Sequence, residues 1–233
     1  MTEAPALFVT KSDYAYTRLR EGILGGDFEP GTVLHQPTLA KTIGISTTPL
    51  REALRRLMSE GLVELDAHRN ARVSPLTVEE ARDVLEVRRS LDPLAVGLAA
   101  ERRTKDDIRL IRETASHVRP LRANPTVHEL VAHRRFHAAV YTASHNDLLV
   151  STLDALWDKA DRYRRLGLES EHSQQDRDQK AREHDALVDA VVRGDAASAA
   201  AIMSAHIETS LGAKAVTRLS RETAAPSDLS PTS

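Results

Sequence analysis

Residues 44–56 read GISTTPLREALRR, and this stretch decides the fold of the first third of the chain. Gly44 suits a left-handed turn that other residues resist, Ser46 is a good N-cap, and Pro49 fits the first turn of a helix. Apolar side chains then recur at i, i+3, i+4, i+7 and i+8, which predicts one buried stripe. The stripe consists of Leu50, Ala53, Leu54, Leu57 and Met58. The pattern indicates a tight turn followed by an amphipathic helix.

The opposite face of this helix is polar and basic. It carries Thr48, Arg51 and Arg55, with Arg56 at its edge. Arg51 and Arg55 lie one turn apart, a spacing that lets both reach phosphates or guanine edges in a DNA groove. The alternative interpretation is an ordinary surface helix with solvated arginines. The flanking sequence has to decide between the two.

The flanking segments predict a winged helix. Before the stretch, apolar spacing predicts a first helix that ends at Gly25-Gly26 and a short second helix around Leu39 and Ile43. The second helix, the turn and the next helix form a helix-turn-helix. After them, residues 62–65 and 71–73 predict two short strands, joined by a hairpin tip at 66–70. A basic tip of this kind can enter the minor groove, where Arg is favoured electrostatically.

Residues 14–74 resemble the DNA-binding domain of the GntR family of bacterial transcription factors. The matching segments are 19–26, 30–34, 39–40, 44–46, 48–54, 60–63 and Arg69. The resemblance implies DNA contacts from the recognition helix and from the wing. The implied contact residues are Ser46, Thr47, Thr48, Arg51, Arg55, His68, Arg69 and Asn70.

Two positions depart from the family pattern. The family usually has Arg where this chain has Thr47, so a charge that contacts DNA is missing. It usually has Gly where this chain has Asn70, and Asn tolerates a positive φ better than most residues. The wing can therefore still form, but the operator sequence of the family does not carry over to this chain.

Composition narrows the class of protein. Hydrophobic residues make up 41% of the 233 residues and aromatic residues only 3%, so the core must be built from aliphatic side chains. The chain has no cysteine, which excludes disulfides, thiolate metal sites and cysteine nucleophiles. No apolar run approaches about 18 residues and no signal peptide is visible, so we expect a soluble cytoplasmic protein without a membrane partner. The net charge of −2 gives no overall signature of nucleic-acid binding.

After residue 77 the helical period runs almost unbroken, which predicts an all-α antiparallel bundle. The expected helices are near 77–102, 105–119, 126–143, 147–166, 174–193 and 196–214. The fold class is therefore mostly α, with an N-terminal winged helix-turn-helix of three helices and a two-stranded wing. The predicted parts are a disordered N-terminus (1–10), the winged helix (11–74), a hinge (75–77), the bundle (78–215) and a disordered tail (216–233).

Four histidines lie on the predicted apolar faces of three bundle helices, and they are His133, His137, His184 and His206. His133 and His137 are spaced i, i+4 and therefore share one helix face. A single histidine of this kind is more often a satisfied core residue. Four buried imidazoles, in contrast, leave many polar atoms to satisfy, and a divalent ion would satisfy them. The spacing leaves both interpretations open.

Residues 80–212 resemble the ligand-sensing domain of the FadR-type GntR regulators, an antiparallel bundle of six or seven helices. The matching segments are 86–92, 98–102, 136–137, 183–184, 194–195 and His206. Many members hold a divalent metal with an Asp-x3-His pair and two further His, and here His133 stands at the place of the Asp. An all-imidazole site is less anionic and favours Zn or Ni over Mn or Mg. His133 could instead turn away and leave a three-His site.

The resemblance also implies a small carboxylate effector that binds at the open metal positions, with a nearby Arg as its counter-ion. Arg88 and Arg134 are the candidates, and either could equally be a surface residue. The sequence thus predicts a ligand-responsive transcriptional regulator, in this family most often a repressor, which binds an inverted-repeat operator as a homodimer. It is not expected to be an enzyme.

Two other interpretations remain open. A metal-dependent hydrolase would use a three-His site with a metal-bound water. It would need a general base, and Glu183 and Asp185 beside His184 are expected to point to other helix faces. Alternatively, the metal could be purely structural, or could itself be the signal.

Overall fold

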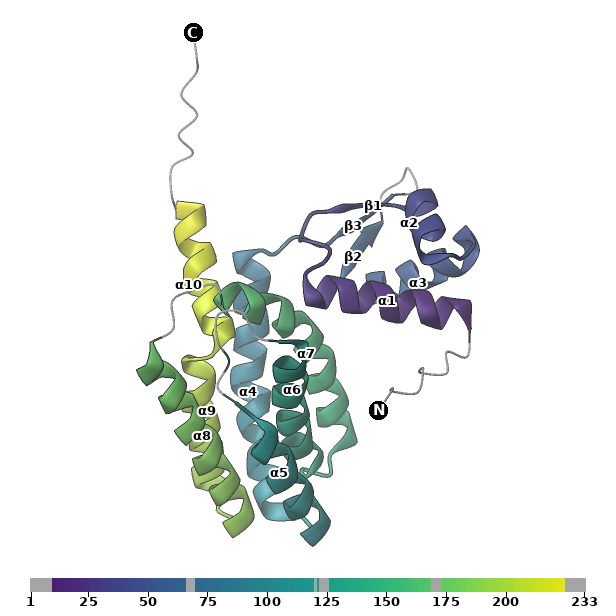
Figure 1. Ribbon diagram of the computed structural model, residues 1–233. Coiled ribbons are helices and arrows are strands. Elements are labelled where there is room, and N and C mark those ends of the chain that lie inside the picture. The colour runs from purple at the N-terminus through teal and green to yellow at the C-terminus, as the bar shows by residue number, and fades with distance from the viewer. Residues whose placement is uncertain (1–9, 66–69, 120, 122–125, 169–172, 225–233) are drawn as a thin grey trace. The chain divides into compact units, whose positions relative to one another are not determined.

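The computed structural model describes residues 10–65, 70–119, 121, 126–168 and 173–224. The chain divides into two compact units, Met1–Leu76 and Thr77–Ser233. The first unit combines three helices with a small sheet, and the second consists of helices in the part that the structure describes (Figure 1). The hairpin tip at 66–69, the segment 1–9 and the last residues, 225–233, lie outside the described residues.

The first unit is a winged helix with a three-stranded sheet. Its elements are α1 (Lys11–Gly25), β1 (Val33–His35), α2 (Gln36–Ile43), α3 (Thr47–Ser59), β2 (Val63–Leu65) and β3 (Asn70–Val73). The sheet is antiparallel in the order β1-β3-β2. Only β2 and β3 were predicted. The strand β1 adds a third member because Gly31, at φ 81°, turns the chain so that it pairs with β3.

The helix α3 buries the predicted stripe with one exception. Leu50, Leu54 and Leu57 are fully buried, but 45% of Met58 is exposed, so the prediction for this residue is wrong. At 100° per residue Met58 lies about 80° around the axis from Leu50, at the edge of the stripe. Ser46 is the N-cap residue, as predicted, although its side chain makes no capping hydrogen bond.

The second unit is a helical bundle. Its helices are α4 (Val78–Arg102), α5 (Lys105–His117), α6 (Val127–Thr142), α7 (Asp147–Leu168), α8 (Gln174–Arg193), α9 (Ala196–Glu208) and α10 (Leu211–Ala224). Several helices begin at a capping box, for example Thr104 with Asp107 in front of α5 and Thr126 with Glu129 in front of α6. The long helix α4 packs against α9 and α7, and places its buried face at the centre of the bundle (Figure 1).

The end of the bundle differs from the prediction. The helix expected at 196–214 ends at Glu208, and α10 begins at Leu211. Because α10 runs to Ala224, the prediction of disorder is wrong for residues 216–224. The helix packs on α7 at Gly167, where a Cβ atom would collide with the carbonyl of Leu211. Ala215 and Val216 complete its apolar side.

No helix among the described residues is both long enough and apolar enough to cross a membrane.

Candidate DNA-binding surface and metal centre

The polar face of α3 is exposed to solvent. The residues predicted to contact DNA from this helix are all exposed, and they are Ser46, Thr47, Thr48, Arg51 and Arg55. Gly44 adopts φ 77° at the end of α2 and makes the tight turn that leads into α3. The turn and the buried stripe together fix which side of α3 faces outward.

The three arginines of α3 have different surroundings. The Nε of Arg51 donates a hydrogen bond to Oε1 of Gln36 at 3.2 Å, and Gln36 is buried at the start of α2. Arg55 has no hydrogen-bond or ionic partner within the described part of the chain. Arg56 instead pairs with Asp13 at 2.8 Å and lies over the ring of Tyr16, so it holds α3 against α1. Arg51 and Arg55 therefore remain the basic groups of the exposed face.

The wing is described only in part. His68 and Arg69, both predicted to contact DNA, lie outside the described residues. Asn70 begins β3 opposite His35, whose Nδ1 lies 3.3 Å from the Asn70 Oδ1. It has no positive φ, since His145 is the single non-glycine residue with one among those described. The replacement of the family's Gly by Asn therefore requires no unusual backbone conformation.

The four predicted histidines come together inside the bundle. His133 and His137 project from α6, His184 from α8 and His206 from α9. Neighbouring ring centroids are 4.6 to 5.5 Å apart. One nitrogen from each of His133, His137 and His184 lies within 4.8 Å of the others, a spacing that could hold a metal ion. We call the four rings the imidazole cluster.

The imidazole cluster is neutral and incompletely hydrogen-bonded. Burial, followed by the neighbouring His206, lowers the pKa of His184 to about 3. Burial and the other imidazoles lower the pKa of His137 well below its ordinary value. Both ring nitrogens of His137 and the Nε2 of His184 have no hydrogen-bond partner among the described residues. Neutral imidazoles with free lone pairs fit a divalent cation.

His206 is oriented by a carboxylate. Its Nδ1 donates to Oε2 of Glu183 at 2.8 Å, and the Nζ of Lys180 donates to the same oxygen at 2.7 Å. Burial alone would raise the pKa of Glu183, but these two hydrogen bonds lower it to about 2. The bond leaves Nε2 as the lone-pair nitrogen of His206 when the ring is neutral. Glu183 therefore contacts the cluster, contrary to the expectation that it points elsewhere, and it does so as a partner of His206.

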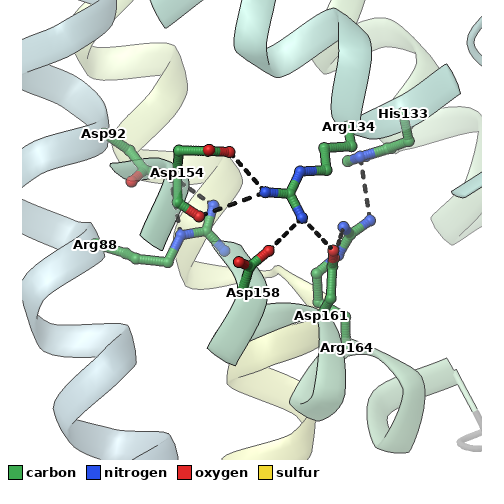
Figure 2. Close-up of polar contacts among 8 residues, drawn as sticks. All are labelled: Arg88, Asp92, His133, Arg134, Asp154, Asp158, Asp161 and Arg164. Atoms are coloured by element: carbon green, nitrogen blue, oxygen red, sulfur yellow. Dashed lines mark hydrogen bonds and ion pairs between the residues drawn. The ribbon is translucent and has the colours of Figure 1, made fainter. Parts of the chain in front are cut away.

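The two arginines predicted to bind an effector are both paired with acids (Figure 2). Arg88 is 5% exposed and donates twice to Oδ2 of Asp92, from Nη2 at 2.6 Å and from Nε at 3.2 Å. Arg134 contacts three carboxylates of α7: those of Asp154 and Asp158 at 2.6 Å and that of Asp161 at 3.4 Å. Arg134 is thus already surrounded by three carboxylates, which gives no support for its role as a counter-ion.

A third arginine reaches the imidazole cluster directly. Arg164 of α7 is 5% exposed, and its Nη2 lies 3.1 Å from the Nδ1 of His133 (Figure 2). Its Nη1 donates to Asp161 at 2.7 Å, and its guanidinium lies 4.8 Å from the ring centroid of Trp157. Arg88 lies 5.0 Å from the same ring. Two buried guanidinium groups therefore stand beside the imidazole cluster.

A cavity of about 550 Å³ opens beside the cluster. Three of the imidazoles line it, together with side chains of α8, α9 and α10. Its polar lining includes His133, His184, His206, Lys180, Glu183 and Lys214. A small molecule in this cavity would contact the imidazole cluster.

Comparison with known proteins identifies the family. Residues 11–73 match the family of bacterial regulatory proteins described as gntR, and residues 83–209 match the FCD domain, which is more than half of the chain. The chain belongs to the gntR family and carries an FCD domain. It is similar to the HTH-type transcriptional regulator LutR of Bacillus subtilis, with 31% identity over 79% of this chain and 92% of LutR.

Two further comparisons agree with this assignment. The HTH-type transcriptional repressor GlaR of Escherichia coli is 27% identical over 83% of this gntR-family chain and 91% of GlaR. The solved structure of E. coli McbR/YncC has the same fold, with a TM-score of 0.73 and 21% identity over 93% of this chain and all of that one. The gntR-family chain is therefore a DNA-binding transcriptional regulator and not an enzyme. These findings do not support the hydrolase interpretation.

Arg164 is a residue of the gntR regulator's site that the sequence analysis missed, and Glu183 is one that it placed on the wrong helix face. A signal for Arg164 was present, since Trp157, Asp161 and Arg164 are spaced i, i+4 and i+7 and share one face of α7. Glu183 gave no comparable signal, because its contact with His206 depends on how α8 packs against α9.

Proposed function

We propose that this gntR-family protein is a repressor that binds an inverted-repeat operator as a homodimer and releases it when a small carboxylate binds in the FCD domain. The imidazole cluster beside an open cavity carries this proposal. The cluster offers a binding site for a divalent metal, and the cavity beside it offers space for a ligand. Such a regulator acts on chromosomal DNA, and we therefore place it in the cytoplasm.

The exposed face of α3 would enter the major groove. Ser46, Thr47, Thr48, Arg51 and Arg55 would contact DNA there, and the wing residues His68, Arg69 and Asn70 would contact the adjacent groove. One helix of 13 residues reads too few base pairs for genomic specificity, which supports a dimer on a two-fold symmetric site. The name of GlaR, a repressor, supports repression.

The imidazole cluster would hold the metal through His133, His137, His184 and His206. Because all four ligands are neutral, the site favours Zn or Ni over Mn or Mg. The bound cation would supply the positive charge that attracts a carboxylate. Arg88 is the better supported of the two predicted counter-ions, since Arg134 is surrounded by acids. A structural metal, or a metal that is itself the signal, is the competing possibility.

A hydrogen-bonded group connects the site to the start of α4. The hydroxyl of Tyr163, next to Arg164 on α7, donates to Oε2 of Glu80 at 2.6 Å and accepts from the backbone N–H of Thr77 at 3.3 Å. Lys159 binds the other oxygen of Glu80 at 2.9 Å. The chain segment 75–77 ends at Thr77 within this group, and we propose that it is the hinge through which ligand binding reaches the DNA-binding domain. A ligand acts in this way only if it binds the two arrangements with different affinity.

DNA selection tests the regulator itself. Purified protein with Zn²⁺ is used to enrich binding sites from a random duplex library, and its mass in solution is measured by light scattering. We expect an inverted repeat with half-sites about one helical turn apart, and a dimer. A library that remains random after several rounds, or a monomer on an asymmetric site, would contradict the proposal.

A further inference from the structure

His133 differs from the other members of the imidazole cluster in its partner. His206 donates to a carboxylate, whereas the Nδ1 of His133 faces the guanidinium of Arg164 at 3.1 Å. Arginine has only N–H donors and no acceptor, so the Nδ1 of His133 must be the acceptor in this bond. The remaining proton of the neutral ring is then on Nε2.

This bond uses the single lone pair that a neutral imidazole possesses. A metal ligand needs the same lone pair, because a histidine coordinates through an unprotonated nitrogen. The Arg164 bond and metal coordination by His133 therefore exclude each other. A metal held by His137, His184 and His206 alone would leave the bond to Arg164 intact.

The loss of this bond would leave Arg164 short of an acceptor. Arg164 is buried, and its acid partner Asp161 is shared with Arg134. A buried guanidinium with a free N–H edge favours a carboxylate, which matches its planar geometry. Leaving that edge unpaired would be unfavourable.

The cavity lies next to the His133 ring, which is bonded to Arg164, so a carboxylate can enter near the guanidinium. His133 lines the cavity, whereas Arg164, which is bonded to His133, does not. His133 thus separates the guanidinium from the space that a ligand can enter. If His133 gives its lone pair to a metal ion, the Arg164 guanidinium loses the acceptor that covers it on this side.

We infer that His133 is a metal-dependent cover for Arg164: coordination of a divalent cation by His133 exposes the guanidinium, which then binds the carboxylate of the effector. The inference rests on the metal and the carboxylate of the proposed function, and it assigns the counter-ion to Arg164. It also makes the two ligands cooperative. Metal binding breaks a buried hydrogen bond that the carboxylate restores, so each ligand raises the affinity for the other.

A double-mutant cycle with Zn²⁺ alone tests the exclusion. Zn²⁺ affinity is measured by competition with a chelating dye for wild type, R164Q, H133Q and the double variant. A hydrogen bond to a charged group is worth about a tenfold change in affinity, so R164Q should raise the Zn²⁺ affinity of wild type about tenfold. In the H133Q background the same substitution should have a clearly smaller effect, since only the charge of Arg164 is then removed.

R134Q is the matched control. Arg134 also binds Asp161 and carries the same charge, but it makes no bond to the His133 ring. It should therefore change Zn²⁺ affinity less than R164Q does. Equal effects of R164Q with and without His133 would show simple charge repulsion and overturn the inference. If wild type binds no Zn²⁺ at all, the proposed metal site fails, and the inference fails with it.

Fluorescence of wild-type protein provides a second test that requires no Arg164 variant. The chain contains one tryptophan, Trp157, which is buried with its ring centroid 4.8 Å from the guanidinium carbon of Arg164. Zn²⁺ should change its emission in wild type as Arg164 is released. In H133Q, Zn²⁺ should bind to the remaining histidines and change the emission less, since only its binding to His137, whose ring centroid lies 5.2 Å from that of Trp157, then affects the indole. An identical change in both proteins would contradict the role given to His133.

Discussion

The exposed face of α3 and the surroundings of the imidazole cluster differ in whether their cations are paired with acids. On α3, Arg55 is exposed and has no partner among the described residues, and Arg51 is held only by the neutral side chain of Gln36. In the bundle, the buried cations Arg88 and Arg164 each have a carboxylate partner. Water stabilises an unpaired cation at the surface, but a buried cation needs a partner.

This difference indicates what each region can bind. The exposed face of α3 can keep its arginines unpaired until a polyanion binds, because water solvates the charges and little stability is lost. The interior must be nearly neutral before its ligand arrives, and the cluster achieves this with unprotonated histidines. A metal ion and a carboxylate can then enter as complementary charges.

Removal of metal should destabilise the protein. A ligand present at 100 to 1,000 times its dissociation constant stabilises the folded state by about 3–4 kcal/mol. Thermal unfolding followed by circular dichroism should therefore show a large fall in melting temperature when Zn²⁺-loaded protein is treated with a chelator. H184A should lose this response, and H128A, an exposed histidine of the same helix as His133, should keep it. Equal melting temperatures with and without chelator would contradict a metal site in the bundle.

E183Q should weaken Zn²⁺ binding about 10- to 100-fold, the usual effect of losing a carboxylate that orients a ligating histidine. The neutral amide accepts a weaker hydrogen bond from Nδ1 of His206 and does not fix the ring as firmly. Zn²⁺ affinity is measured by dye competition. D185N is the control, because Asp185 lies on the same helix and is exposed. If both variants bind Zn²⁺ equally well, Glu183 does not orient the site.

R51A should cost about 1–3 kcal/mol of specific DNA binding if the side chain meets a base edge. R55A should cost less, because Arg51 is already positioned by Gln36 while Arg55 must be ordered on binding. Fluorescence anisotropy with selected and scrambled duplexes measures both. R109A, on the surface of α5, should have no effect. A loss for R51A that is the same on both duplexes would assign the residue to a phosphate.

Y163F should lower the free energy of unfolding by about 1 kcal/mol, since it removes a hydrogen bond to Glu80. Zn²⁺ affinity should be unchanged, because the Tyr163 hydroxyl contacts the start of α4 and not the cluster. Urea unfolding and dye competition give the two values. A variant that loses Zn²⁺ affinity would show that Tyr163 supports the site itself and would argue against its part in transmission.

Most structural features that depend on a local sequence pattern could be predicted from the sequence. The turn at Gly44 follows from its residue type, and the buried stripe of α3 and the inward histidines follow from spacing along one helix at a time. The structure confirms them except at Met58, which is exposed. The strand β1 was missed because three residues are too few for an alternating pattern, and its pairing partner lies almost forty residues further on. The helix α10 was missed because a Ser- and Thr-containing segment forms a helix here by packing on α7.

The site shows the same division. Spacing placed His133, His137, His184 and His206 on apolar faces, but only the packing of α6, α8 and α9 brings the rings together. Arg134 directly follows His133 in the sequence, yet its side chain contacts the acids of α7. Partners across helices, such as Arg164 for His133, are set by tertiary structure and not by the sequence of either helix.

The most direct test measures affinity for the selected operator with Zn²⁺ present while small carboxylates are added one at a time. We expect at least one carboxylate to weaken specific binding by about 5- to 150-fold, the usual range of allosteric coupling. R164Q and H133Q should bind the operator normally but lose most of this response. A carboxylate that binds the protein and leaves operator affinity unchanged, or variants that respond like wild type, would contradict effector release through Arg164.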